Sequence, residues 1–207
     1  MMQAPQDIEA RFGPDAAAVV APRIGTPPIG DPVRSPAAAD RVRGSLVGAA
    51  IGDALGEPVE DRSRRWIAER CGDVRGYLVP SPATSSDTLL TLITADSLLA
   101  DPADHPARLA ARLLGVDVPT RGRSMKHART ELLAGRAWWQ AAMPRSAGTA
   151  GAARCASFGL LWAGDPRRAA YEAALSTSVT HGHPVATTAA AAFAAAVALA
   201  ARGDGPL

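Results

Sequence analysis

Glycines recur at every fourth position around a single carboxylate between residues 44 and 56. On a helix, Gly44, Gly48, Gly52 and Gly56 would share one slowly drifting face, with Asp53 among them. Each glycine inside a helix costs about 1 kcal/mol relative to alanine, so the stripe indicates close approach of another backbone or of a ligand. A carboxylate within such a stripe also needs a partner, which can be a ligand, an ion pair or a helix that it caps.

Other short segments place polar side chains beside proline or at a predicted helix start. Glu60 follows Pro58 just beyond the glycine stripe and, taken alone, is typical of a surface loop carboxylate. Residues 85–88, Ser-Ser-Asp-Thr, precede an apolar helical pattern and form a good N-cap cluster. His181 and His183 precede a further helix start, where a histidine can be a structural hydrogen-bonding group or a ligand.

The elements that must position these residues are helices, because apolar positions recur with helical spacing and strand-like alternation is hard to find. The class predicted is therefore all-α. Asp40 and Asp165-Pro166 are read as helix starts, and 76–82 as a loop. The predicted helices cover residues 41–56, the segment after residue 85, and residues 106–115, 127–142, 152–162, 166 onward and 184 to just before Gly203.

Composition divides the chain into a leader and one domain. Residues 1–38 are rich in proline and alanine and have no sustained period, which predicts a disordered leader. Residues 39–207 are predicted to form the folded domain, and 47% hydrophobic residues are enough for one core.

Several classes of protein are excluded or disfavoured. The formal charge is +2, and no basic block interleaved with aromatic residues indicates a nucleic-acid partner. Cys71 and Cys155 have no zinc-type spacing and make no disulfide framework. The N-terminus lacks a secretory signal pattern, and the alanine-rich stretch 185–201 is less apolar than a bilayer demands. We therefore expect a cytoplasmic protein without a membrane partner.

Taken together, these segments resemble the ADP-ribosylglycohydrolase family, which includes the dinitrogenase-reductase-activating glycohydrolase. Three later blocks occur in the family's order and are similar to its Thr-Asp-Asp-Thr, Gly-Asn-Gly-x-Ala-Met-Arg and Thr-His-x-x-Pro motifs. The opening signature is Arg41-x-x-Gly44-x-Leu46-x-Gly48-x-Ala50-x-Gly52-Asp53-Ala54-Leu55-Gly56-x-Pro58-x-Glu60, and the later blocks are residues 85–92, 148–154 and 176–184.

The resemblance implies a compact, all-helical domain that hydrolyses the glycosidic bond between ADP-ribose and an acceptor, with Mg²⁺ or Mn²⁺ in a central cleft. The expected ligand is ADP-ribose or an ADP-ribosylated protein or small molecule. By matching positions, the resemblance assigns catalysis to Glu60 and Asp87, metal binding to Ser85, Asp87 and Thr88, and substrate binding to Gly148, Thr149, Gly151, Arg154 and His181.

The chain departs from the family pattern at residues that matter for this chemistry. Ser86 stands where the family has a metal-binding aspartate, and Thr149-Ala150 replaces the Asn-Gly of the ADP-ribose loop. The family's C-terminal Asp-x-Asp-Thr metal block has no counterpart before Leu207, so the domain is expected to lack its C-terminal helices. We expect one metal ion or none, since losing even an outer-shell partner costs 10- to 100-fold in metal affinity or activity.

The sequence leaves three hypotheses open. In the first, the chain is an active or weakly active ADP-ribosyl hydrolase with Asp87 and Thr88 as metal ligands and Glu60 assisting the water. In the second, it is a non-catalytic protein that binds ADP-ribose, a nucleotide or a protein. In the third, it is a remnant that does not fold stably alone. It can equally be a fragment of a longer protein or a shortened relative. The acceptor, the oligomeric state and the role of residues 1–38 are not determined by the sequence.

Overall fold

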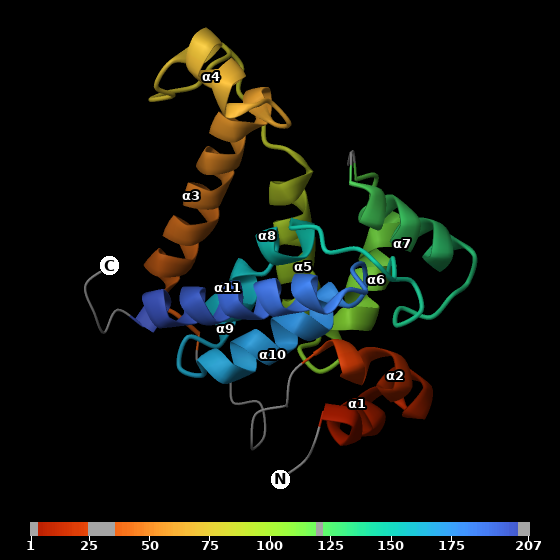
Figure 1. Cartoon of the computed structure of the whole chain (residues 1–207). Helices are drawn as coiled ribbons and strands as arrows, with labels where there is room; N and C mark the ends of the chain where they lie inside the picture. Colours follow the sequence, from red (N-terminus) through yellow and green to blue (C-terminus); the bar gives the residue numbers. More distant parts are fainter. Residues whose placement is uncertain (1–3, 25–35, 119–121, 203–207) are drawn as a thin grey trace.

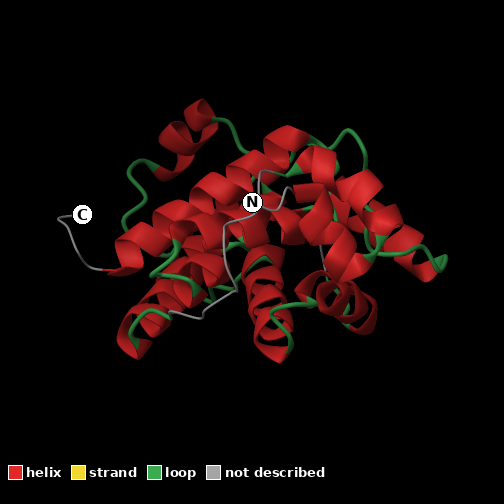
Figure 2. Cartoon of the chain, turned by 90° about the horizontal axis from the view of Figure 1, so that it is seen from below, coloured by secondary structure: helices red, strands yellow, loops and turns green. Residues whose placement is uncertain are grey.

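The described residues form helices joined by loops, which confirms the all-α prediction (Figures 1 and 2). The computed structural model describes residues 4–24, 36–118 and 122–202. Within these ranges it contains no strand, and an isolated parallel bridge joins Met143 to His181. The helices are α1 (Ala4–Phe12), α2 (Pro14–Val20), η1 (Ala21–Arg23), α3 (Ala39–Gly56), η2 (Glu57–Val59), α4 (Arg64–Cys71), α5 (Ser86–Ala100), α6 (His105–Gly115), α7 (Arg123–Leu133), α8 (Ala150–Ala153), α9 (Ala156–Leu161), α10 (Pro166–Thr177) and α11 (Pro184–Arg202).

Helices α10 and α11 lie side by side, with α9 against them, and α1 and α2 lie below them in Figure 1. Alanines at every fourth position of α11, from Ala186 to Ala198, are buried. Gly159 of α9 lies so close to α11 that an added Cβ would be 2.5 Å from the carbonyl oxygen of Ala194. Small residues therefore set the close spacing in this part of the core.

By length and composition alone, α11 could also cross a membrane.

Most predicted helix starts are confirmed because their caps are local. Ser85 accepts a hydrogen bond from the backbone N–H of Asp87 at 3.0 Å, and Asp165 accepts one from that of Arg168 at 3.0 Å. Asp40 is not a cap: it lies in the first turn of α3, where it pairs with Arg43.

Two predicted helices end differently in the structure. The helix predicted over residues 127–142 starts earlier and ends at Leu133, just before Gly135, whose φ of 80° favours glycine and breaks the helical path. The helix predicted over residues 152–162 is two short helices, α8 and α9.

The N-terminal segment differs from the prediction of a disordered leader, because α1, α2 and η1 pack on the domain. The bonds that hold α1 are long-range: Arg11 donates to both carboxylate oxygens of Glu172 on α10, each at 3.1 Å. Tyr171 donates to Asp7 at 2.6 Å. Ile8 and Val20 are fully buried in the largest apolar cluster. Local composition cannot reveal contacts between residues about 160 positions apart in the chain. Residues 25–35 of the predicted leader lie outside the described structure.

Helix α3 stands away from the body and carries η2 and α4 at its far end (Figure 1). It is anchored near its start, where Arg41 donates to the carbonyl of Ala201 at 2.7 Å, and near its end by Asp53. Ala54 is its one buried residue, and a Cβ added at any of the four stripe glycines would meet no described atom within 4 Å. The close approach that the glycine stripe predicts is thus not made by any described residue.

This open face makes Gly48→Ala a test of what covers α3 in solution. We expect the substitution to raise the free energy of unfolding by about 0.5–1 kcal/mol in a urea titration, because alanine favours the helix and has free space there. The matched control is Gly159→Ala, whose Cβ would collide with the backbone of α11 and should lower that free energy by about 1–3 kcal/mol. A loss of stability in both variants would show that another surface occupies the α3 face.

The buried carboxylate of Glu172 should hold α1 in place. It accepts from Arg11, from Arg168 at 3.1 Å and from His105 at 3.0 Å. Burial raises its pKa, but these donors outweigh burial and hold the pKa at about 2, below the ordinary value of 4.5.

We therefore expect Glu172→Gln to lower the free energy of unfolding by about 3–5 kcal/mol at neutral pH. Because the folded pKa is depressed, the difference from the unaltered protein should be full above about pH 4.5 and shrink as the pH falls toward 2. Urea titrations at several pH values measure it. The control, Glu69→Gln, breaks an exposed pair with Arg65 and should change stability by less than about 1 kcal/mol. An equal effect of both substitutions would contradict the role of Glu172.

Candidate functional site

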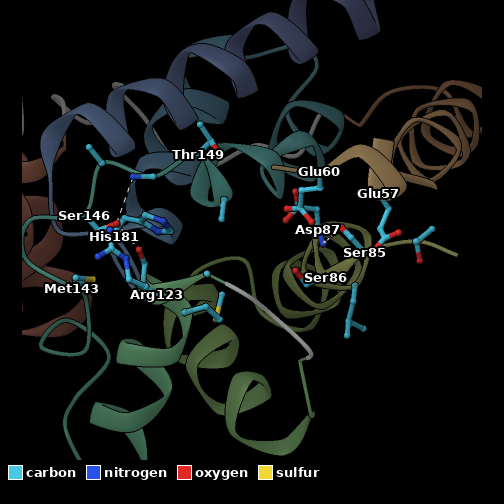
Figure 3. Close-up of a pocket in the computed structure, with 18 of the residues that line it drawn as sticks. Glu57, Glu60, Ser85, Ser86, Asp87, Arg123, Met143, Ser146, Thr149 and His181 are labelled. Carbon is cyan, nitrogen blue, oxygen red and sulfur yellow. Dashed lines mark hydrogen bonds between the residues drawn. The ribbon is translucent and has the colours of Figure 1, made fainter. Parts of the chain in front are cut away.

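A large cavity lies between η2, the N-terminus of α5, the start of α7 and the loop that precedes α8. Its volume is about 850 Å³, within the usual range for small-molecule sites. Figure 3 shows its labelled side chains in two groups, with carboxylates and serines on one side and Arg123, Met143, Ser146 and His181 on the other. The lining residues are Glu57, Glu60, Thr84–Asp87, Leu89, Gly122–Met125, Met143, Arg145–Ala150 and His181.

The end of the cavity that carries Glu57, Glu60 and Asp87 is called the acidic end here. Next to it, the Asp53 carboxylate caps α5. The start of α5 is therefore the partner that a carboxylate within the glycine stripe needs. Its Oδ2 accepts from the backbone N–H groups of Ser85 at 2.9 Å and Thr88 at 3.2 Å, and from the Thr88 hydroxyl at 2.5 Å. Burial raises the pKa of Asp53, but the hydrogen bonds from Thr88 and Ser85 outweigh it and hold the pKa below its ordinary value. The ionised carboxylate therefore ties α3 to the start of α5.

This cap also defines the roles of Ser85 and Thr88, two of the residues assigned to metal binding. The Ser85 hydroxyl accepts the N–H of Asp87, and the Thr88 hydroxyl is committed to Asp53. Asp87 itself lines the cavity and is exposed. Partial burial, followed by the nearby Asp53 carboxylate, raises the pKa of Asp87. Glu60 lines the same end and is exposed, as is typical of a carboxylate on a loop.

The residues at the acidic end do not fit a dedicated pair of magnesium ions. Magnesium takes hard oxygen ligands in near-octahedral geometry. The described residues include no group of three or more histidine, cysteine, aspartate or glutamate side chains placed to hold a metal. Asp53 and Thr88 already satisfy each other, and Ser86 offers a neutral hydroxyl. Asp87 alone remains as a carboxylate at the position where the family motif holds metal.

At the opposite end, the glycine-rich loop lies against His181. Gly148 and Thr149 line the cavity, and an added Cβ on Gly148 would be 3.4 Å from Nε2 of His181. His181 is 1% exposed, and its Nδ1 is 2.8 Å from the Thr180 hydroxyl. Burial, followed by the positive charge of Arg154, lowers the pKa of His181 to about 4. The ring is therefore neutral at physiological pH, with Nε2 toward the loop.

Two residues assigned to substrate binding lie behind the cavity wall instead of on it. Gly151 packs against Thr177, where an added Cβ would be 2.5 Å from the methyl group. Arg154 is fully buried and donates to the carbonyl of Ser176 and to the Thr180 hydroxyl, each at 3.0 Å. Both residues fix α8 against the end of α10. They position Gly148 and His181 without lining the cavity themselves.

Sequence reasoning missed several cavity residues, above all Arg123, Ser124, Arg145 and Ser146. Arg145 and Ser146 directly precede the glycine-rich loop, so the neighbouring motif could have indicated them. Ser124 and Ser146 contact each other through their hydroxyl oxygens at 2.5 Å, which joins α7 to this loop. Arg123 begins a helix that comes to the cavity only through tertiary packing, and no local signal marks it.

Comparison with known proteins identifies the family. A sequence model of the ADP-ribosylglycohydrolase family matches residues 34–207. An uncharacterised protein of Archaeoglobus fulgidus is 33% identical over 171 residues, which cover 77% of this chain and 55% of that protein. The chain thus spans about half the length of this relative. No solved structure matches the chain significantly. With the family's motifs gathered around one cavity, the chain belongs to the ADP-ribosylglycohydrolase family.

Proposed function

We propose that the cavity binds the ADP-ribosyl group of a modified molecule. The observation that carries the proposal is the division of charge along the wall, with Glu57, Glu60 and Asp87 at one end and Arg123 and Arg145 lining the rest. ADP-ribose is divided in the same way, since it joins a terminal ribose rich in hydroxyl groups to a diphosphate. Ribose hydroxyls donate hydrogen bonds to carboxylates, and phosphate oxygens accept them from guanidinium groups.

This division predicts the direction in which the ligand lies. The terminal ribose would contact Asp87 and Ser86 at the start of α5, and the diphosphate would lie toward the glycine-rich loop. Backbone N–H groups of such a loop suit phosphate oxygens. The bond to the acceptor would then lie beside Asp87 and Glu60, at the end of the cavity nearest to η2.

Hydrolysis of that bond is a second candidate function, favoured by the exposed carboxylate of Asp87. Cleavage of a glycosidic bond through an oxocarbenium-like state needs a positioned water and a proton for the leaving group. The raised pKa of Asp87 suits a carboxylate that accepts the proton of the attacking water. The water oxygen would bond to the anomeric carbon as its proton passes to Asp87, and the bond to the acceptor would break as the acceptor atom takes a proton from solvent.

Magnesium, if bound, would supply Lewis-acid stabilisation of ribose oxygens, but the described donors do not fit a dedicated pair of ions. Because Ser86 stands in place of a metal-binding aspartate, we expect a lower rate of hydrolysis as well as a lower affinity for metal. We therefore propose that recognition of ADP-ribose is the main function and that any hydrolysis is slow.

Calorimetric titration of ADP-ribose into the 207-residue protein, with and without excess magnesium, tests the binding proposal. We expect a Kd on the order of micromolar in both conditions. Asp87→Asn should weaken binding about tenfold, because it removes a charged hydrogen-bond acceptor for the ribose, and should abolish any hydrolysis of ADP-ribosylated arginine. The matched control is Asp96→Asn on the same helix, which breaks an exposed pair with Arg112 and should change neither.

The results of these titrations and of the hydrolysis assay distinguish the two proposed functions. No heat from a folded protein in either condition would refute the binding proposal. Binding that appears only with magnesium would contradict the interpretation of the donor set around Asp87. Hydrolysis by the unaltered protein that survives Asp87→Asn would remove Asp87 from the second candidate mechanism.

A further inference from the structure

The N-terminal arm, defined here as residues 4–24 with α1, α2 and η1, lies outside the part of the chain that matches the family model. That match begins at residue 34. The arm nevertheless belongs to the largest apolar cluster, together with residues of α5, α6, α7 and α10. Its buried side chains in that cluster are Ile8, Ala16, Ala17 and Val20. The arm is therefore part of the core, although it is not part of the matched family domain.

Polar bonds hold the arm on the body at three places. Arg11 donates to Glu172 on α10 at 3.1 Å and to the carbonyl of Ala103, just before α6, at 2.9 Å. Further along the arm, the Thr187 hydroxyl at the start of α11 donates to the carbonyl of Arg23. Removing one partner of a buried ion pair leaves the other charge uncompensated, which is strongly destabilising. These bonds therefore hold the arm in one place.

Phe12 connects the arm to the chain that enters the cavity. Its ring meets the ring of Trp138 edge to face, with the two centroids 5.1 Å apart, an arrangement that aromatic pairs prefer. Trp138 is 5% exposed and lies shortly before Met143, where the chain begins to line the cavity. Phe12 therefore restrains the position of Trp138 and of the loop that follows it.

The loop of residues 143–150 is also paired with the turn after α10. Met143 donates its N–H to the carbonyl of Thr180 at 3.1 Å, and Gly182 donates back to the carbonyl of Met143 at 3.0 Å. The same turn contains Val179, which is fully buried in the apolar cluster that includes the arm. The arm thus supports the loop in two ways, through the aromatic pair before it and through the cluster beneath the turn.

The acidic end of the cavity is held by contacts that do not involve the arm. Its position depends on the Asp53 carboxylate, which accepts from the N–H groups of Ser85 and Thr88. The anchor at the other end of α3 joins Arg41 to the carbonyl of Ala201. Loosening the arm should therefore disturb the end of the cavity formed by residues 143–150 and leave the acidic end in place.

We propose that the arm is a positioning element for the cavity, in which docking of Arg11 and Phe12 holds the loop of residues 143–150 against the turn after α10. The arm acts as a strap from α10 to the start of α6 and to Trp138. This role concerns the shape of the cavity, whatever ligand binds there. The working unit of this chain therefore includes residues 4–24 as well as the matched family domain.

Hydrogen exchange of backbone amides in the 207-residue protein, followed by mass spectrometry, is the measurement, and it needs no ligand. We expect Phe12→Ala to speed exchange about tenfold or more in residues 4–24 and in the peptides that contain the amides of Met143 and Gly182, because local opening exposes them. The amides at the start of α5 that Asp53 caps should exchange at the rate of the unaltered protein.

Three further variants test whether this effect comes from the docked arm. Arg11→Gln removes the bonds to Glu172 and should give the same pattern of exchange as Phe12→Ala. Phe12→Leu keeps an apolar side chain at Trp138 and should retain most of the protection. The control is Glu9→Gln, an exposed side chain on the same helix, which should change nothing. Circular dichroism checks folding, which is expected for Phe12→Ala because Phe12 is only partly buried.

The pattern of exchange decides between the alternatives. Faster exchange confined to residues 4–24 would overturn the positioning role, because the arm would then undock without moving the loop. Faster exchange throughout, including the start of α5, would also overturn it, because the arm would then stabilise the fold as a whole.

A parallel titration with ADP-ribose separates this role from the proposed function. The expected exchange pattern in a protein that does not bind ADP-ribose would support the arm's role and refute the proposed function. Binding of ADP-ribose by a protein whose loop exchange is unchanged in Phe12→Ala and Arg11→Gln would refute the arm's role and leave the proposed function standing.

Discussion

The Asp53 carboxylate is the constraint on which the acidic half of the cavity depends. It satisfies two backbone N–H groups and one hydroxyl at the start of α5, where a helix otherwise leaves donors without partners. Helix α3 has few other contacts with the body, so this cap sets where its far end lies. Glu57 and Glu60 follow directly on the chain, so the same cap places them at the end of the cavity that Asp87 lines. The same negative charge contributes to the raised pKa of Asp87.

The opposite half of the cavity is held by the turn that links α10 to α11. Arg154 bonds the last turn of α10 and the Thr180 hydroxyl, while Gly182 lies so close to Pro144 that a Cβ would be 2.7 Å from its Cα. The bridge between Met143 and His181 continues this contact. The loop of residues 143–150 is thus fixed against a turn buried in the core. Separate sets of contacts position the two ends of the cavity. A substitution that alters the side chains at one end therefore need not displace the other end.

The accuracy of the sequence predictions follows the range of the interactions involved. The starts of α5 and α10 are predicted correctly because Ser85 and Asp165 cap N–H groups two or three residues away. The packing of α1 is missed because Arg11 meets Glu172 only in the folded chain. Arg123 is missed for the same reason, since nothing near it in the sequence marks a cavity. Family motifs identified Asp87, Gly148, Thr149 and His181 on the wall, but could not show that Gly151 and Arg154 lie behind it.

Residues that match the family motifs and residues that depart from them differ in where they lie relative to the cavity wall. Gly151 and Arg154, which match the family motif, are buried supports whose loss would displace the wall. Ser86 and Thr149, which depart from it, both line the cavity. Changes at wall positions alter ligand contacts at little cost to folding, whereas changes at the buried supports would create cavities or unsatisfied donors. Because Asp87, Gly148 and His181 are retained on the same wall, the departures favour a changed use of this cavity over its abandonment.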